Sequence, residues 1–191
     1  MGAAPLPWLE SPLCQAGQRW QWDGVRFEVM HPTSADYAQP GLSSNAMSCV
    51  LRVHNGQRVA WLTGDVGQDQ EVALAARHPG ERADVLMAPH HGSRSSSSPV
   101  WLNELMPRWV LIQAGHLNRF GHPAPEVVAR YEARAARWLA TPACGEMRWH
   151  SATPDAVRCH RVAARRYWHW RAPAGRASVS ADASGPEQAA D

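Results

Sequence analysis

Two short, continuous apolar runs, each followed by a helical pattern, constrain the fold of this chain most. The runs are ADVLMAP at residues 83–89 and RWVLIQAG at residues 108–115. The segment SPVWLNELMP (98–107) begins with the serine and proline that favour a helix start, and APEVVARYEARAARW (124–138) is amphipathic. Strands without polar alternation are typical of sheets covered by helices, so the order strand, helix, strand, helix predicts an α/β fold.

Further strands are predicted before this succession. GVRFEVMHP (24–32) alternates apolar and charged residues, which indicates a half-buried strand. MSCVLRVHNGQRVAWLT (47–63) contains two β-rich runs joined by Asn55 and Gly56, a pair that favours a type I′ turn, so we expect a hairpin. GQDQEVALAARHPG (67–80) carries acidic residues early and a glycine at its end, which predicts a short helix.

After the last helix, EMRWH (146–150) and DAVRCHRV (155–162) predict two more short strands. The length of 191 residues favours a single domain. We expect an irregular lead-in at residues 1–17, an ordered region at 18–170 and a disordered tail at 171–191. The tail has almost no large apolar residue and so cannot bury enough surface to offset its ordering entropy.

The overall composition excludes few classes of function. The formal net charge of +2 is too small to indicate a nucleic-acid or membrane partner by itself. All 19 basic residues are arginines, whose planar guanidinium group suits phosphate. The chain has no 18-residue apolar run, and its start, MGAAPLPWLE, lacks the basic and apolar regions of a signal peptide. We therefore expect a soluble chain that is not exported.

The four cysteines show none of the spacings of a metal or redox motif. They form no C-x-x-C pair and do not alternate with histidine at helical intervals. The sequence therefore favours reduced, partly buried thiols at Cys14, Cys49, Cys144 and Cys159.

Three polar clusters follow three predicted strands, where α/β folds place their sites. Each cluster alone is equally consistent with a polar turn or loop, but a carboxylate and imidazoles at successive strand ends can converge on one point, as a divalent metal requires. Adjacent histidines point in different directions unless the backbone turns sharply, so we expect one of the pair to be a direct ligand and the other to orient it. The clusters contain Asp65, then His90 and His91, then Asn118, Arg119 and His122.

Three segments together resemble a known family. LRVHNGQRVAWLTGDV, ADVLMAPHHGSRSSSSP and GHLNRFGHPAPEVV, in this order, resemble the C-terminal half of the metallo-β-lactamase-like domain of ComEC, the competence protein for DNA uptake. The resemblance runs from about Gln18 to Trp170, and the combination of PHHGS with NRFGHP is its most specific part. It implies the distal half of an αββα sandwich, with a mixed sheet and flanking helices.

The resemblance also implies roles for individual residues. In that superfamily two divalent metals, manganese or zinc, activate a water that attacks a phosphodiester. Asp65 resembles the bridging carboxylate and His91 the last metal-binding histidine, while His90 would orient its neighbour. His122 and Arg119 would stabilise the charge of the phosphate. Substrate contacts are implied for Ser93, Arg94 and Asn118, and for Asn45 and Ser48 in the family's N-x-x-S segment.

One signature of the superfamily is absent from these 191 residues. They contain no H-x-[HD]-x-D-H run. The only histidine before the first of the three resembling segments is His31, which has no acidic companions in the same motif. We therefore expect a fragment that binds metal weakly and does not cleave DNA without the missing proximal half. Members of the family are inner-membrane proteins whose substrate is single-stranded DNA, and the membrane segments are also absent here.

This expectation includes a sheet that lacks its partner sheet. One face should then be partly open, and we expect some of Val50, Trp61, Val85 and Leu111 to lie on it. Such a fragment should be marginally stable and prone to associate.

Two other functions are compatible with the sequence. One is a non-catalytic DNA-binding remnant that contacts phosphate through Arg94, Arg119, Arg165 and Arg166. The other is a serine hydrolase that uses Ser93 with a histidine, although the chain has no G-x-S-x-G motif.

Overall fold

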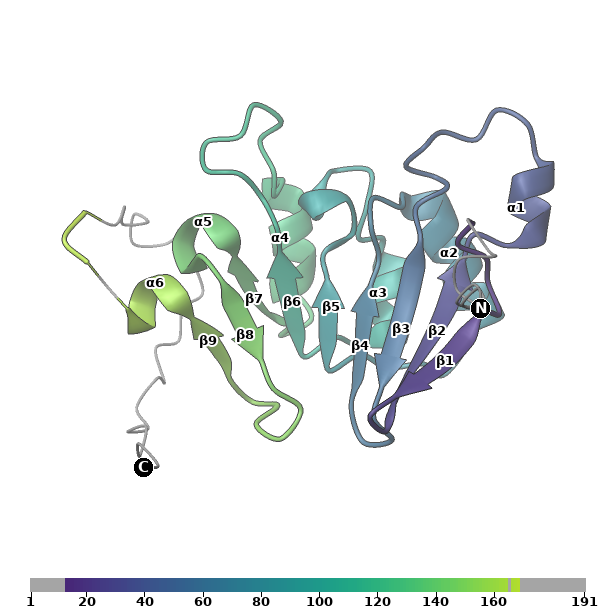
Figure 1. The fold of residues 1–191 in the computed structure, drawn as a ribbon. Coiled ribbons are helices and arrows are strands. Elements are labelled where there is room, and N and C mark those ends of the chain that lie inside the picture. Colours follow the sequence, from purple (N-terminus) through teal and green to yellow (C-terminus); the bar gives the residue numbers. More distant parts are fainter. Residues whose placement is uncertain (1–12, 165, 169–191) are drawn as a thin grey trace, which may run out of the picture.

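The computed structural model of the chain describes residues 13–164 and 166–168, which form an α/β fold around one large mixed sheet (Figure 1). The lead-in expected at residues 1–17 is described only from Leu13 onward. The tail expected at residues 171–191 lies outside the described residues.

The large sheet contains seven strands that lie in sequential order from β1 to β7. Neighbouring strands are antiparallel from β1 to β4 and parallel from β4 to β7. This mixed sheet with flanking helices is the predicted fold class. The strands are β1 (Arg19–Trp22), β2 (Val25–His31), β3 (Val50–His54), β4 (Val59–Leu62), β5 (Val85–Met87), β6 (Trp109–Ile112) and β7 (Arg137–Ala140).

The antiparallel part of the sheet contains two hairpins, of which only the second was predicted. Asp23 and Gly24 join β1 to β2, and both have positive φ angles, 48° and 78°, as a type I′ turn requires. The hairpin of β3 and β4 is confirmed, but its type I′ turn at Asn55 and Gly56 is wrong. The side-chain oxygen of Asn55 accepts hydrogen bonds from the backbone N–H groups of Gln57 and Arg58 at 3.1 and 2.9 Å, and in this loop only Gly56 has a positive φ. The side chain of Asn55 therefore stabilises the turn, and Gly56 is the residue that adopts the left-handed conformation.

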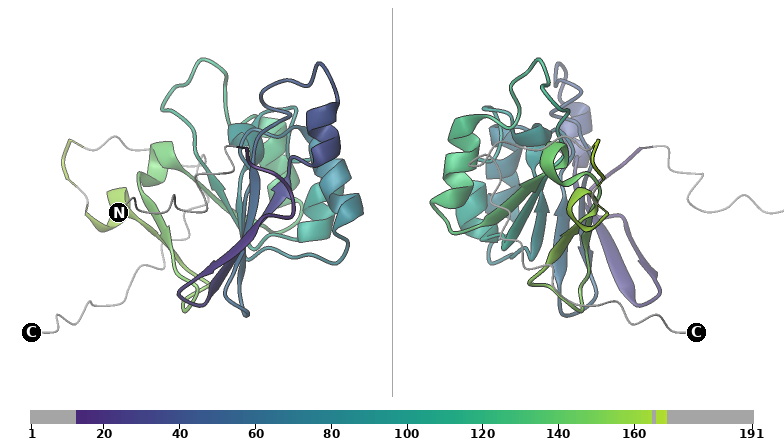
Figure 2. Two further views of the ribbon diagram at one scale, coloured as in Figure 1. Left: turned by 45° about the vertical axis from the view of Figure 1, so that its right-hand side comes forward. Right: turned by 90° about the vertical axis from the view of Figure 1, so that its left-hand side faces the viewer.

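The helices connect the parallel strands and cover one face of the sheet. In Figure 2, α2, α3 and α4 lie together on the same side of the strands. Ser98 caps α3 as predicted, because its side chain accepts a hydrogen bond from the backbone N–H of Trp101 at 3.2 Å. The helices are α1 (Ser34–Ala38), α2 (Gln68–Arg77), α3 (Pro99–Leu105), α4 (Pro125–Glu132), α5 (Thr141–Cys144) and α6 (His160–Ala163), with a 3₁₀ turn, η2, at Pro89–Gly92.

The helix predicted over residues 124–138 is shorter than expected. It ends at Glu132, after which Ala135 has a φ of 53° and the N–H of Ala136 donates back to the carbonyl of Tyr131. The alanine-rich turn has a high helix propensity, so the sequence pattern did not separate it from the helix. The residues after it form β7, a strand that was not predicted, and β1 was missed as well.

The main core lies between the sheet and the helices. Trp61 on β4 and Trp101 on α3 are completely buried there, with ring centroids 5.1 Å apart in an edge-to-face arrangement. Val50 belongs to the same cluster. The expectation that Val50 and Trp61 lie on an open face is therefore wrong, since both side chains face the helices.

The opposite face of the sheet is covered only in part. A two-stranded ribbon of β8 (Met147–Trp149) and β9 (Val157–Cys159) packs there against Val85, Trp109 and Leu139. Val85 is therefore buried, contrary to expectation, while Leu111 is half-buried. Farther along this face, Trp20 stacks on Phe27 and remains 48% exposed.

The four cysteines form two disulfides, so the prediction of reduced thiols is wrong. Cys14 pairs with Cys49, and Cys144 pairs with Cys159. The partners are 35 and 15 residues apart in the chain, and the fold brings them together. Cys14 precedes β1 and Cys49 precedes β3, while the second bridge joins the end of α5 to the end of β9. A search for local cysteine motifs does not detect such pairs.

A buried carboxylate holds the serine-rich loop against the helices. Glu71 on α2 is fully buried, and its two carboxylate oxygens accept hydrogen bonds from the backbone N–H groups of Ser97 and Ser98, each at 2.5 Å. The Ser97 hydroxyl is 2.6 Å from that of Tyr131, and Arg130 donates to the Ser97 carbonyl at 3.3 Å. The serine run thus braces the fold between α2 and α4.

Within the described part of the chain, no helix is both long enough and apolar enough to cross a membrane.

Candidate functional site

The three polar clusters meet at one edge of the sheet, beyond the carboxyl ends of β4, β5 and β6 (Figure 1). These strands are parallel neighbours, so their ends point to the same edge. The connections after them are tied together: the Thr63 hydroxyl donates to the Met87 carbonyl at 2.8 Å, and the His90 N–H donates to the Gly64 carbonyl at 3.0 Å. The parallel order of the strands thereby places Asp65 beside the histidine pair.

Asp65 is positioned by the glycine before it. Gly64 has a φ of 55°, and a Cβ atom at this position would lie 2.9 Å from the Cβ of Ser48. The Ser48 hydroxyl in turn accepts a hydrogen bond from the Asp65 N–H at 3.1 Å. Ser48 therefore fixes the backbone that carries the carboxylate, which is an orienting contact.

The backbone turns sharply through the histidine pair. His90 and His91 have φ angles of 48° and 56°, in the left-handed region that non-glycine residues rarely adopt, and Gly92 follows with 78°. Gly92 also has no room for a side chain, because a Cβ would lie 2.8 Å from that of Pro123. This turn is what allows two adjacent imidazoles to lie in one site.

His91 faces the carboxylate of Asp65. Its Nε2 lies 3.4 Å from Oδ1 of Asp65, and its Nδ1 lies 2.7 Å from the backbone carbonyl of Gln113. A carbonyl oxygen only accepts, so Nδ1 carries a proton and Nε2 is the nitrogen turned toward Asp65. Orientation of a metal-binding histidine by a carbonyl is a common arrangement. Gln113 was not predictable from the sequence, because a backbone carbonyl leaves no signature in side-chain motifs.

His90 turns to a different set of partners. Its Nε2 lies 3.3 Å from the side-chain nitrogen of Asn45, which donates, and its ring centroid lies 5.9 Å from that of His122. Asn45 and His90, predicted to belong to one site, are thus brought together. His90 lies between the Asp65–His91 pair and the loop that carries His122.

His122 is partly buried beside the other two histidines. Its pKa is lowered, first by burial and then by the neighbouring His90 and His91, while Asp65 acts in the opposite direction. Within the described residues, its Nδ1 is buried without a hydrogen-bond partner. Phe120 stacks on the imidazole with ring centroids 5.7 Å apart. His122 is therefore held neutral at the edge of the site.

The side chains of Asn118 and Arg119 are engaged within their own loop. Asn118 Oδ1 accepts from the His122 N–H at 2.9 Å, and Nδ2 donates to the carbonyls of His122 and Gly115 at 2.6 and 3.1 Å. The Arg119 guanidinium lies over the ring of Phe120, 4.8 Å from its centroid. Asn118 thus stabilises the loop. Arg119 contacts Phe120, which in turn stacks on His122.

Ser93 and Arg94 point to partners outside this cluster. The Ser93 hydroxyl contacts that of Ser95 at 3.1 Å, which is not the serine–histidine contact that a serine hydrolase needs. Arg94 forms an exposed ion pair with Glu126 on α4 at 2.8 Å. Of the arginines considered for a DNA-binding remnant, Arg165 lies outside the described residues.

The donor set at this edge is small for a metal centre. Among residues 13–164 and 166–168, no three His, Cys, Asp or Glu side chains are grouped as a metal ion would need them. The pair of Asp65 and His91 suits two positions of a coordination sphere, but the described residues do not complete it.

Comparison with known proteins connects this chain to competence proteins. No protein-family profile matches it. It is 36% identical over 135 residues to "Competence protein ComA" of Neisseria gonorrhoeae, an alignment that covers 70% of this chain and 19% of the relative. It is 32% identical over 139 residues (71% and 16%) to "Recombination protein 2" of Haemophilus influenzae. It is also 32% identical over 133 residues (70% and 17%) to "ComE operon protein 3" of Bacillus subtilis. The chain thus spans less than a fifth of these relatives, and the matches support a relationship to the ComEC family.

Proposed function

We propose that this chain acts in natural transformation and supplies the distal part of a metal-dependent site that hydrolyses single-stranded DNA. The similarity to competence proteins supports the role in transformation. The observation that carries the proposed chemistry is the contact between His91 Nε2 and Asp65 Oδ1 at 3.4 Å.

The hydrogen bond from His91 to Gln113 supports this proposal, because it decides which ring nitrogen faces Asp65. Because the Nδ1 proton of His91 is donated to the Gln113 carbonyl, Nε2 is the ring nitrogen that faces the Asp65 carboxylate oxygen. A ring nitrogen and a carboxylate oxygen that face each other are joined by a proton on the imidazole or by a cation held between them. Asp65 and His91 would hold a divalent cation through these two atoms, together with further ligands. We propose that a divalent metal, manganese or zinc, is the partner of this pair.

The remaining residues of the site have supporting roles. A bound metal would supply an activated water for attack on a phosphodiester. Within this chain, Asn45 and Ser48 orient His90 and the Asp65 backbone, and His122 with Arg119 forms the side that would face the phosphate. Since the described residues offer only two suitable ligands, we propose that tight metal binding and cleavage need ligands from an H-x-[HD]-x-D-H run, which this chain lacks.

A cleavage assay tests this function. The purified chain is incubated with manganese and linear single-stranded DNA, alone and with a second chain that carries the histidine-rich run of the resembling family. We expect little cleavage by the chain alone and clear cleavage by the two together. That activity should be lost with a chelator or in Asp65→Ala, and kept in the matched control Asp69→Ala, whose carboxylate is exposed on α2. Strong Asp65-dependent cleavage by the chain alone would show that the ligands present suffice. Cleavage that Asp65→Ala leaves intact would refute the proposed site.

A further inference from the structure

The loop between β6 and α4, at residues 113–124, presents two large apolar side chains to solvent. Leu117 is 85% exposed and Phe120 is 66% exposed. In Figure 1 this loop rises beyond the end of β6, at the edge of the sheet that carries the candidate site. Single apolar side chains on a surface are ordinary, but two on one loop beside a polar site favour a contact surface.

Hydrogen bonds hold this loop in one conformation. The Asn118 side chain makes three of them to backbone groups of the same loop, at 2.6, 2.9 and 3.1 Å, and the Gly121 N–H donates to the Asn118 carbonyl at 3.1 Å. Leu117 and Gly121 have positive φ angles, 49° and 69°, so the chain turns sharply on both sides of Phe120. The exposed ring is therefore carried by an ordered backbone, which reduces the entropy lost when a ligand binds.

Phe120 connects the loop to the histidines of the candidate site. Its ring lies at an angle of 18° to that of His122, with centroids 5.7 Å apart, and the guanidinium carbon of Arg119 lies 4.8 Å from its centroid. His122 in turn lies 5.9 Å from His90, measured between ring centroids. Most of Phe120 remains exposed in spite of both contacts, so its ring extends the site as a flat apolar surface.

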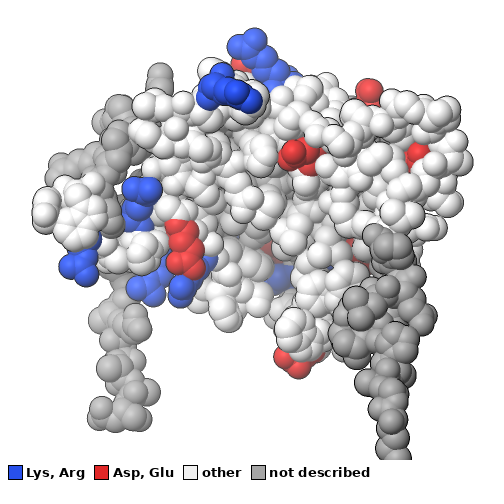
Figure 3. Space-filling view, turned by 45° about the horizontal axis from the view of Figure 1, so that its top comes forward, with Lys and Arg blue, Asp and Glu red and all other residues white. Residues whose placement is uncertain are grey.

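The charge around the loop suits an anion. No Asp or Glu occurs in the sequence between Glu104 and Glu126, and Glu126 is paired with Arg94. Figure 3, in which the top of Figure 1 comes forward, shows a mostly uncharged surface with few acidic side chains. A polyanion can therefore approach Arg119 and Phe120 without repulsion from carboxylates of the loop itself.

We propose that Phe120 stacks on an unpaired base next to the phosphate that the candidate site would act on, and so selects single-stranded over double-stranded DNA. This role depends on the proposed function, because the site must act on DNA. Stacking uses the face of a base, which all four bases offer, so this contact does not select a sequence. In a duplex the neighbouring base pairs cover that face, and a base must be unstacked before it reaches Phe120. Arg119, which lies over the same ring, adds a positive charge for the adjacent phosphate.

A membrane surface is the alternative partner of this loop. Leu117 and Phe120 are apolar and Arg119 is basic, a combination that also suits the boundary between lipid headgroups and acyl chains. The stack of Phe120 on His122 favours a base, because it ties the exposed ring to a histidine of the site, whereas insertion into lipid needs no such contact.

Binding of fluorescently labelled strands, measured by anisotropy in the presence of a chelator, tests the proposal. An oligothymidylate is compared with an abasic strand of the same length, which keeps the phosphates and lacks the bases. We expect the full chain to bind the oligothymidylate about tenfold more tightly. Phe120→Ala should remove most of this difference and leave binding of the abasic strand nearly unchanged, because the phosphate contacts remain. Phe120→Trp keeps a ring for stacking and should retain the difference.

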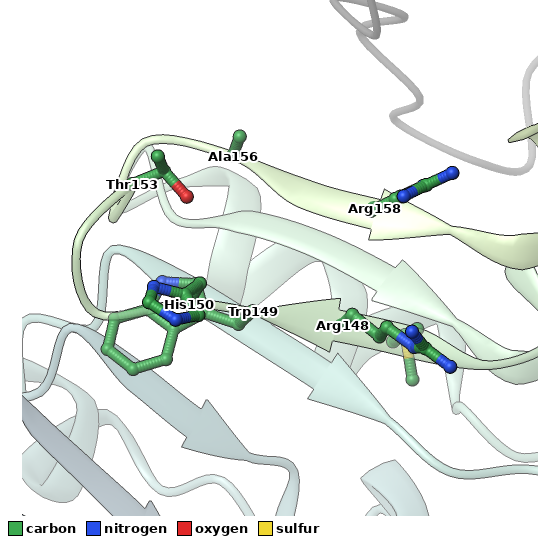
Figure 4. A pocket seen from close by; sticks show the side chains of 7 residues that line it. Arg148, Trp149, His150, Thr153, Ala156 and Arg158 are labelled. Atoms are coloured by element: carbon green, nitrogen blue, oxygen red, sulfur yellow. The ribbon is translucent and has the colours of Figure 1, made fainter. Parts of the chain in front are cut away.

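The control is an exposed ring outside the site. His150 follows β8 and lines a shallow pocket on the β8–β9 ribbon (Figure 4). Its side chain is exposed, and the ribbon is a separate sheet from the one whose edge carries Phe120. His150→Ala should therefore bind both strands like the original chain. A loss of base preference as large as that in Phe120→Ala would contradict a specific role of Phe120.

The same titrations decide between the possible partners. The original chain should also prefer oligothymidylate to its duplex with oligoadenylate, and an unchanged preference in Phe120→Ala would overturn the proposal. Equal affinity for oligothymidylate and the abasic strand, or no measurable binding of either, would overturn it too. Weaker binding of Phe120→Ala to phosphatidylglycerol vesicles, with an unchanged base preference, would assign the loop to a membrane and contradict stacking.

Failure of this role and failure of the proposed cleavage are distinguishable. The chelator prevents metal-dependent cleavage, so a base preference that follows Phe120 supports the stacking role even where the cleavage assay fails. Cleavage that depends on Asp65, without a base preference that depends on Phe120, would leave the proposed cleavage intact and refute the stacking role.

Discussion

Reduction of the two disulfides is expected to lower the melting temperature of this chain by more than about 10 °C. Each bridge restricts the unfolded chain, and separations of 35 and 15 residues correspond to about 3 to 4 kcal/mol each. For a chain of this size, 1 kcal/mol shifts the melting temperature by about 2–4 °C. Calorimetry with and without dithiothreitol measures the effect.

Paired serine variants separate the two contributions. Cys14→Ser with Cys49→Ser, and Cys144→Ser with Cys159→Ser, should each account for part of the loss, and reductant should have no further effect when all four changes are combined. Titration of four free thiols in the unreduced, denatured chain would show that the bridges do not form.

Replacement of Glu71 by alanine should destabilise the fold by about 3–5 kcal/mol. The change leaves the buried backbone N–H groups of Ser97 and Ser98 without their acceptor, and each unsatisfied donor costs about 1–3 kcal/mol. The melting temperature should fall by about 10 °C. Glu126→Ala is the matched control, because Glu126 forms an exposed ion pair and should matter little. Equal melting temperatures for the two variants would contradict the bracing role of Glu71.

Glu71 also predicts a pH dependence. Burial raises its pKa above the usual 4.5, although the hydrogen bonds from Ser98 and Ser97 and the charge of Arg130 oppose this shift. The folded state therefore holds the proton more tightly than the unfolded state, so the contribution of this group is fully present below pH 4.5 and declines as pH rises through the raised pKa. As pH rises from 4.5 through the raised pKa of Glu71, the free energy of unfolding of the original chain should fall relative to that of Glu71→Gln. A constant difference between the two chains from pH 4.5 upward would contradict the shift.

Local periodicity predicted β5 and β6 of the parallel part of the fold, but not β7, and it predicted the edge at which the polar clusters lie. The short apolar runs around Val85 and Val110 indicated buried strands, and the parallel order of these strands brought Asp65, His90 and His122 to one edge. Propensity failed where the same residues suit two structures. The alanine-rich turn before β7 has the composition of a helix. The chain nevertheless leaves the helix after Glu132, and Ala135 adopts a left-handed conformation.

Long-range partners were not predictable from patterns of this kind. The cysteine pairs depend on how β3 and β9 are placed, and Glu71 appears in sequence as an ordinary charged residue of an exposed helix face. The carbonyl of Gln113, which sets the tautomer of His91, likewise becomes visible only when the strands are in register.

We propose that Asp65 and His91 form an incomplete metal site, which titration calorimetry of the full chain with manganese and with zinc examines. We expect weak metal binding, with a Kd above about 10 μM, because structural zinc sites with a full set of four ligands bind with about 10–16 kcal/mol. Asp65→Ala and His91→Ala should each weaken it by about tenfold or more, whereas Asp69→Ala should not. Nanomolar binding would contradict the incompleteness of the site, and weak binding that is unchanged in both Asp65→Ala and His91→Ala would contradict its location.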